Sequence, residues 1–503
     1  MSDGIFRKKS LKQISNEVAQ GLTDGHETSL HKVLSVRDLT FMGIAAIVGA
    51  GIFSTIGKAS FDGGPGIILL FMFVAIACGF SAICYAEFAS MVPVSGSAYT
   101  YSYVAFGEII AWIIGWALIM EYALGAATVS IAWSEYLNKL LGGAIPYEWS
   151  HSPFESFTDT LGVTHQGIMN APALIILLLL TLLLIKGTQE SAIVNGIIVF
   201  IKVAIVIIFI VVGWQFINPA NHTPYFIPAD QAPVIDAGGK EIANYSGVFK
   251  HGWGGVLGGA AIVFFAFIGF DAVSTAAQEA KNPKRDMPIG ILGSLVVCTI
   301  LYILFGHVLT GVANWKDFVD PLKGREASVA YAISTYMTGY GWLATSVTVA
   351  ILAGFSSVIL VMLMGQSRVF YSMANDGLLP KVFSDLHPKY RTPYKSNWIL
   401  FVFVGAFAAF VPGSVAGDLT SFGTLFAFVL VSLGIWILRR KSPDMERPFK
   451  TPLVPLVPIL GAIICTAMIY ALDAQTLRVA GIWMVLGLVV YFIYGKKHSK
   501  LNN

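Results

Sequence analysis

The sequence predicts an all-α integral membrane protein with twelve transmembrane helices. First, 56% of its 503 residues are hydrophobic and only 12% are charged, whereas about 25% are charged in an ordinary soluble protein. Second, apolar runs of about 20 residues recur along the chain, and a helix of that length crosses the hydrocarbon core of a bilayer. Third, the net charge of +3 is small and the basic residues are spread over the loops, so no basic face for nucleic acid is expected.

Hydropathy places the twelve spans along the chain. We expect them near residues 39–59, 67–90, 107–140, 169–187, 192–216, 252–280, 287–312, 340–374, 397–412, 418–438, 455–472 and 477–495. Most Lys and Arg residues then lie on the same side of the membrane as the N-terminus, which the positive-inside rule assigns to the cytoplasm. Residues 1–38 show no signal-peptide pattern, so we expect a cytoplasmic N-terminal segment, a cytoplasmic tail at 496–503 and a location in the plasma (inner) membrane.

The first span contains the glycine-rich run Gly43 to Phe53. Gly49 and Gly51 flank one small residue, and each glycine costs about 1 kcal/mol relative to alanine inside a helix. We interpret this run as a break in the helix. Backbone freed at membrane depth must find partners in the protein or in a substrate. A half-helix starting near Ile52 would present free N–H groups and the positive end of its dipole, which suit an amino acid carboxylate.

A second interrupted run lies in the sixth span, at Phe264 to Asp271. Two broken helices in corresponding positions indicate a transporter binding site, whereas small residues alone would also fit close helix packing. We expect a ten-helix core at 39–438, with breaks near 47–51 and 265–270, arranged as a five-plus-five inverted repeat. Residues 439–495 would form two accessory helices.

Three ionisable residues stand at mid-span depth: Glu121, Lys202 and Asp271. Each is a functional candidate, because a charge in the membrane is costly unless it faces a partner in the bundle. The alternative is an ion pair that only ties spans together. Lys202 has no charge within one helical turn, and an apolar setting disfavours the charged form of an amine, so it is a candidate proton switch. Glu87, at the inner end of its span, is expected at a cytoplasmic gate or in a helix cap.

Other classes of membrane protein find less support in the sequence. The chain has no TVGYG filter, no GxxxxGK[ST] loop, no HExxH motif and no Cys/His cluster, so we expect no cofactor, no metal and no enzyme activity. The four cysteines lie in apolar spans and are expected to be reduced. An intramembrane enzyme and an amino-acid-binding sensor remain the non-transport alternatives.

Four stretches, in this order and spacing, resemble the amino acid–polyamine–organocation superfamily, and within it the bacterial form of the cationic amino acid transporter branch. They are Gly43 to Gly57, Tyr85 to Tyr99, Phe264 to Asp271, and Gly365 to Pro380. The resemblance covers roughly residues 33 to 495. It implies a LeuT-type fold, in which two unwound regions hold an amino acid that is carried by alternating access.

The resemblance also implies roles for residues at the two breaks. Backbone amides at Gly49, Ala50 and Gly51 would bind the substrate carboxylate. The carbonyl groups of Ile47, Phe265 and Ile268 would receive the substrate ammonium. Ala266, in the second loop, is also expected at the substrate. Phe265 matches the aromatic gate of the family, although a phenylalanine here also fits an ordinary apolar core.

Lys202 matches the place where sodium-driven relatives hold a cation between the first and eighth spans. Our hypothesis is that the protonated Lys202 donates hydrogen bonds to carbonyls freed by the break near Gly43 to Ile47. Glu121 and Asp271 would help to order the site or relay the proton. Proton symport is therefore expected. Ser356 and Ser357 on the eighth span are hydroxyls that a sodium site would use, so sodium symport stays an alternative, as does exchange.

The resemblance points Phe355 at the substrate side chain. A ring there leaves little room, which favours small or medium neutral L-amino acids, whereas a free Glu121 carboxylate would favour a cationic substrate. The expected partners are the amino acid, the proton and the lipid bilayer, and a small membrane subunit is left open.

Overall fold

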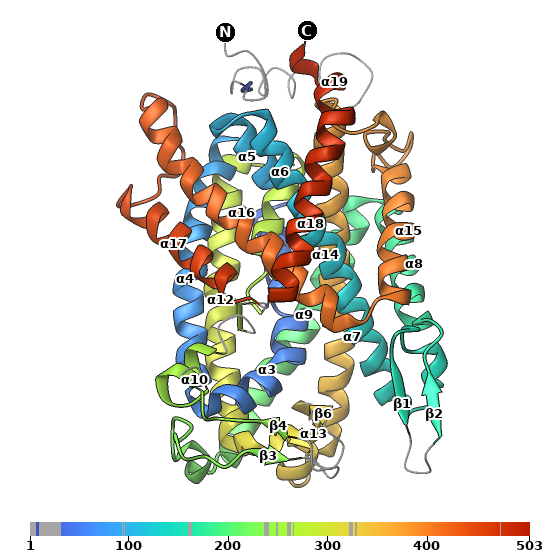
Figure 1. Cartoon of the computed structure of the whole chain (residues 1–503), viewed down its shortest axis with the longest axis vertical. Helices are drawn as coiled ribbons and strands as arrows, with labels where there is room; N and C mark the ends of the chain where they lie inside the picture. The colour runs from blue at the N-terminus through green and yellow to red at the C-terminus, as the bar shows by residue number, and fades with distance from the viewer. Residues whose placement is uncertain are drawn as a thin grey trace.

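The computed structural model describes residues 7–9, 32–92, 94, 96–158, 163–235, 241–247, 250–258, 263–264, 266–320, 325–326, 329–472 and 474–502. Its body is a bundle of helices (Figure 1). Arg7 donates a hydrogen bond to the carbonyl oxygen of Leu501, 2.8 Å away, so segments from near both chain ends meet at one face. We call this face the terminal face.

Within the described residues, seven helical segments are long and apolar enough to cross a membrane. They are Ala59–Met91, Glu108–Leu140, Ser191–Phe216, Pro283–Val312, Gly341–Asn375, Leu419–Lys441 and Ala474–His498. Three shorter apolar helices are α8 (Ala171–Lys186), α15 (Tyr394–Phe410) and α17 (Leu456–Tyr470). At 1.5 Å per residue each measures about 25 Å, slightly less than the hydrocarbon layer. The chain is an all-helical, multi-pass membrane protein.

Two further apolar segments are interrupted. In the first, α2 (Val36–Ile47) is followed by α3 (Ala50–Gly63). In the second, α10 (Gly252–Gly258) precedes the 3-10 helix η6 (Phe270–Glu279). Each piece is too short to span a bilayer alone, which is why length and composition select only the longer helices.

The remaining helices follow the chain between these segments. The longer ones are α4 (Ile67–Met91), α6 (Glu108–Ile119), α7 (Gly125–Leu140), α9 (Thr188–Gly213), α12 (Pro283–Val312), α14 (Gly341–Asn375), α16 (Gly413–Lys441) and α18 (Ala474–Val490). Shorter ones are α5 (Ser97–Ala105), α13 (Val329–Tyr336), α19 (Lys496–His498) and the π-helical turn η2 (Met120–Leu124). One- and two-turn pieces are η1 (Gly64–Gly66), η3 (Tyr147–Trp149), η4 (Trp214–Phe216), η5 (Pro219–His222), η7 (Trp315–Phe318), η8 (Lys381–Phe383), η9 (Tyr491–Gly495) and η10 (Lys500–Asn502).

Among the residues that the structure describes, three two-stranded antiparallel ribbons lie in connections away from the terminal face (Figure 1). They pair β1 (Ser156–Thr158) with β2 (Thr164–Gln166), β3 (Val234–Ile235) with β4 (Glu241–Ala243), and β5 (Val319–Asp320) with β6 (Arg325–Glu326). Each strand has only two or three residues, so the ribbons are confined to the loops and add no layer to the helical body.

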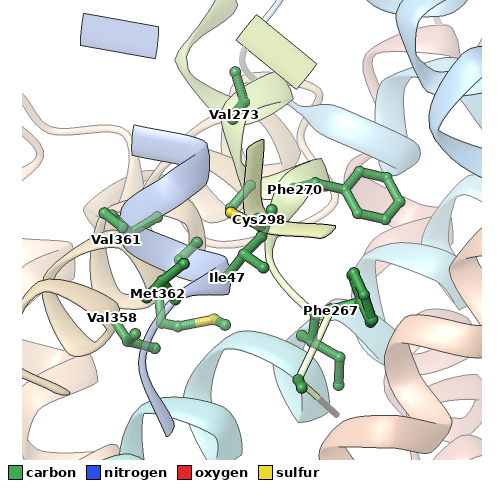
Figure 2. Packing of buried hydrophobic residues seen from close by; sticks show 14 of the residues in the cluster. Ile47, Phe267, Phe270, Val273, Cys298, Val358, Val361 and Met362 are labelled. Carbon is green, nitrogen blue, oxygen red and sulfur yellow. The ribbon is translucent and has the colours of Figure 1, made fainter. Parts of the chain in front are cut away.

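Helix α2 lies at the centre of the apolar core. Figure 2 shows the side chain of Ile47 among Cys298 of α12 and Val358 and Met362 of α14. All four cysteines are free and buried in the described structure, and their reduced state stays a prediction. Since α2 touches α9, α12, α14 and η6, any change in its path affects most of the bundle.

At the terminal face a buried ion pair ties η6 to α14. Arg368 donates to Glu279 across 2.9 Å, and neither side chain is more than 1% exposed. The backbone of Leu34, just before α2, also exchanges hydrogen bonds with Glu279 and Lys281, at 2.9 Å and 2.8 Å. These contacts join the start of α2, the end of η6 and the last turns of α14.

Glu87, at the end of α4, is also fully buried at this face. Its carboxylate accepts hydrogen bonds from Arg439 (2.7 Å) and from the backbone N–H of Thr451 (2.7 Å), and it forms an ion pair with Arg447 at 3.2 Å. These contacts tie α4 to the end of α16 and the connection that follows. A role of Glu87 in a gate stays a prediction.

Glu108, at the start of α6, collects partners from both ends of the chain. Its carboxylate lies 3.5 Å from the Arg7 guanidinium and accepts hydrogen bonds from Tyr491 (2.8 Å) and Ser499 (2.5 Å). The backbone N–H of Glu108 also donates to the carbonyl of Arg7. The side chain is fully buried by these contacts.

The Glu279→Gln variant is expected to lose about 3–5 kcal/mol of stability, because the Arg368 guanidinium stays buried without its carboxylate. The matched control is Glu446→Gln, whose pair with Lys284 is exposed on both sides and should contribute little. Melting temperatures of the purified variants in detergent provide the measurement. If both variants had the same melting temperature, the buried pair would not stabilise the terminal face.

Candidate functional site

The first break lies at the glycine motif. Val48 (φ −77°, ψ 92°) and Gly49 (φ −169°, ψ −119°) leave the helical region, and α3 begins at Ala50, two residues earlier than the sequence suggested. A Cβ atom on Gly49 would lie 2.2 Å from a methyl group of Val358, so only glycine lets α14 approach this closely. The first N–H groups of α3, including those of Ala50 and Gly51, have no partner within their own helix.

The second break precedes η6. Residues 266–269 form a turn, and Gly269 has the left-handed φ of 114°. A Cβ atom there would lie 2.6 Å from the Cβ of Ala46, so glycine is required both for the conformation and for the close approach of α2. Ala266 and Ile268 are buried beside this turn. Phe265 lies outside the described residues.

Tyr302 of α12 connects the two breaks. Its hydroxyl lies 2.6 Å from the carbonyl oxygen of Ile47 and 2.9 Å from that of Ala266. A hydroxyl has a single proton, so it donates to one of these oxygens at a time. Tyr302 was not among the residues that the sequence pattern indicated. Its only signal was a tyrosine in an apolar span, whose buried hydroxyl needs a partner.

Lys202 lies fully buried against the first break. Its ammonium donates to the carbonyl oxygens of Ala45 (3.0 Å) and Val48 and to the hydroxyl of Ser357 (3.0 Å). The Ser357 hydroxyl donates in turn to the carbonyl of Gly354, 2.8 Å away. Three N–H donors thus meet three acceptors, and none of these acceptors is a carboxylate.

The neighbouring Ser356 does not join this cluster. Its hydroxyl donates to the carbonyl of Leu352, in the preceding turn of α14. Successive helical residues point about 100° apart, so only one of two adjacent serines can face Lys202.

Glu121 and Asp271 lie beside each other, not beside the Lys202 ammonium. Glu121 belongs to the π-helical turn η2, and the next residue, Tyr122, donates to one Asp271 oxygen at 2.7 Å. Among the described residues, neither oxygen of Glu121 nor the second oxygen of Asp271 has a hydrogen-bond partner, although all three are buried. Such π-helical turns are frequent at functional sites.

Phe355 packs inside the bundle. Its ring meets that of Tyr136 edge to face, with centroids 5.5 Å apart. The Tyr136 hydroxyl donates to the carbonyl of Phe53 in α3, 3.1 Å away. Phe355 and Tyr136 therefore form an aromatic pair that contacts the first turn of α3, next to the first break.

Comparison with known proteins gives a consistent set of matches. Residues 34–493 match a family described as amino acid permease. The chain is 40% identical to the branched-chain amino acid permease BcaP of Bacillus subtilis, over the whole of both chains. It is 37% identical to the methylthioribose transporter of the same organism, over 99% of each chain. It is 33% identical to the vacuolar cationic amino acid transporter 4 of Arabidopsis thaliana, over 82% of this chain and 64% of that one.

The Gly269→Ala variant is expected to be destabilised by about 2–5 kcal/mol, because an alanine pays for the left-handed φ and also collides with Ala46. Gly293→Ala is the control, since a Cβ there meets only a methyl group of Thr40, at 3.9 Å. Adding Ala46→Gly should restore the part of the loss that comes from the collision. Melting temperatures in detergent test this order, and a G269A protein as stable as G293A would contradict it.

Proposed function

This chain belongs to the amino acid permease family, and we propose that it is a proton-coupled symporter that takes up small or medium neutral L-amino acids by alternating access. The observation that carries the proposal is the bonding of the Lys202 ammonium to the carbonyls at the first break. The proposed location is the plasma (inner) membrane, with both termini in the cytoplasm.

We propose twelve transmembrane helices in a LeuT-type arrangement. The seven long, three shorter and two interrupted apolar segments support this number. Residues 39–438 would form the five-plus-five inverted repeat, and residues 439–495 the two accessory helices. The two interruptions fall in the first and sixth of these segments, where an inverted repeat places them.

The substrate site is proposed between the two breaks. Free amides at the start of α3, near Gly49 to Gly51, suit a carboxylate. The carbonyls of Ile47 and Ile268, with that of Phe265, would receive the ammonium. The Tyr302 hydroxyl lies within hydrogen-bond distance of the Ile47 oxygen. A carbonyl oxygen accepts two hydrogen bonds, so this oxygen can bind both the hydroxyl and the substrate ammonium. Phe265 is proposed as the aromatic gate.

The protonation of Lys202 is proposed to control the first break. An ammonium donates three hydrogen bonds, whereas a neutral amine donates two and carries a lone pair. Loss of the proton therefore removes one of the three hydrogen bonds that Lys202 donates, together with the charge that strengthens the other two. The path of α2 then becomes easier to change, which links proton release to the conformational cycle.

Two observations favour a proton over sodium at this place. The Lys202 ammonium already occupies the carbonyls that would hold the ion. Of the two serines that a sodium site would use, Ser357 accepts a hydrogen bond from Lys202, and Ser356 lies outside the Lys202 cluster. Asp271, bonded to Tyr122 and beside Glu121, is proposed as a second group that carries a proton.

The Lys202→Met variant is expected to lose proton-driven uptake by at least about tenfold, because a thioether has no proton to exchange and leaves two carbonyls unsatisfied. Lys395→Met is the control, since that lysine pairs with Asp385 at an exposed position. Radiolabelled alanine uptake into proteoliposomes, with an inward proton gradient and no sodium, provides the measurement. Unlabelled leucine, arginine and methylthioribose serve as competitors.

Full proton-driven uptake by K202M would refute the assigned role of Lys202. Uptake that ignored the proton gradient and followed sodium or internal amino acid would instead make the protein a sodium symporter or an exchanger. Competition by methylthioribose alone would replace the amino acid by a different substrate class, and competition by arginine would indicate that the Glu121 carboxylate sets the specificity.

The Phe355→Ala variant is expected to raise uptake of phenylalanine relative to alanine several-fold, because removing the ring frees space beside the first break. Tyr136→Phe is the control, since it keeps the ring contact and removes only the hydroxyl. Paired uptake assays give the ratio of the two substrates. An unchanged ratio in F355A would place the substrate side chain elsewhere.

A further inference from the structure

A small pocket opens between α2, α9 and α14. Asp38 and Met42 line it from α2, Ser191 and Asn195 from α9, and Leu360 from α14. We call it the side pocket. Most of its wall is apolar, so its few polar groups decide what it can hold.

The side pocket lies in line with the Lys202 cluster. The same three helices build both, and the pocket is nearer the terminal face on each of them. On α2, Met42 precedes Ala45 by three residues, and on α14, which runs toward the terminal face, Leu360 follows Ser357 by three. On α9, Asn195 precedes Lys202 by seven residues, which is two turns along the same helix face and about 10 Å.

Asn195 lines this pocket and has an unpaired polar atom. The residue is only 5% exposed, and its side-chain oxygen has no hydrogen-bond partner among the described residues. A buried acceptor without a partner costs about 1–3 kcal/mol. Packing alone does not explain a polar side chain here, because an apolar residue of similar size would avoid this cost. A water molecule that enters when α2 moves away from α9 would satisfy the oxygen.

We propose that the side pocket is the route by which Lys202 releases its proton toward the terminal face, and that Asn195 positions the water molecule that receives it. The N–H bond of the ammonium breaks, its electron pair stays on the amine, and the proton passes to water and then to the solvent. This inference rests on the proposed proton coupling. It separates the proton route from the substrate route between the breaks.

An apolar layer closes this route in the described conformation. Val199 lies between Asn195 and Lys202 on the same face of α9 and is 1% exposed. Met42 of α2 is also buried beside the pocket. Water reaches the ammonium only when α2 moves away from α9, so proton release is tied to the same motion that opens the first break.

The test compares net uptake with exchange in proteoliposomes. Net uptake requires Lys202 to lose its proton in each cycle, whereas exchange of internal for external alanine does not, because the carrier can return with both ligands bound. Asn195→Leu is expected to reduce net uptake at least tenfold and to change exchange less than twofold. Asn195→Asp keeps an acceptor oxygen and should restore net uptake.

Two further variants complete the test. Ser191→Ala is the control, because that hydroxyl lines the same pocket but already donates to the carbonyl of Gly187 at 2.7 Å. Met364→Trp fills the pocket from α14 and should reproduce the N195L behaviour, so the inference stays testable if N195L does not fold.

Equal loss of both activities in N195L and M364W, or full net uptake in both, would overturn the inference. Failure of the proposed function has a different signature. The unmodified protein would then show no uptake driven by the proton gradient, before any variant is compared.

Discussion

The packing of one buried ammonium against an open helix end is the contact on which the centre of this protein depends. The carbonyls of Ala45 and Val48 are left without helical partners where α2 stops, and Lys202 supplies the donors that they lack. Bilayer lipid offers no substitute. A broken helix and a buried charge would each be unfavourable alone, whereas together each satisfies the other. The geometry of the break and the position of the Lys202 side chain therefore depend on each other.

The second break is held in a different way. Gly269 allows the turn and the approach of Ala46, while Tyr302 places one hydroxyl between the carbonyls of Ile47 and Ala266. The two interrupted segments thus share a hydrogen-bond donor from a third helix. Because that donor serves one oxygen at a time, a ligand that binds either carbonyl changes what the other one receives. This gives the two loops a direct physical connection without a charged group between them.

The family resemblance seen in the sequence is confirmed by the match over residues 34–493 and by the relatives. Glycine spacing indicated the interruptions, and isolation in an apolar run indicated Lys202. The partners of these residues could not be predicted in the same way. Whether Ser356 or Ser357 faces Lys202 depends on the rotation of α14, and the π-helical turn at Glu121 arises from packing. Glu87 contacts Arg439, which lies more than 300 positions later in the chain. Only the folded bundle brings these two side chains together.

Glu108 has a consequence for how the protein is made. Arg7 precedes it in the chain, whereas Tyr491 and Ser499 come nearly 400 positions later. During synthesis on the ribosome, only Arg7 of these three partners is available to the Glu108 carboxylate until the last helix has been inserted. The terminal face therefore completes its assembly after the membrane-embedded centre has every segment it needs. A nascent chain stalled before residue 491 would contain both interrupted segments, but its terminal face would lack the Tyr491 and Ser499 contacts to Glu108.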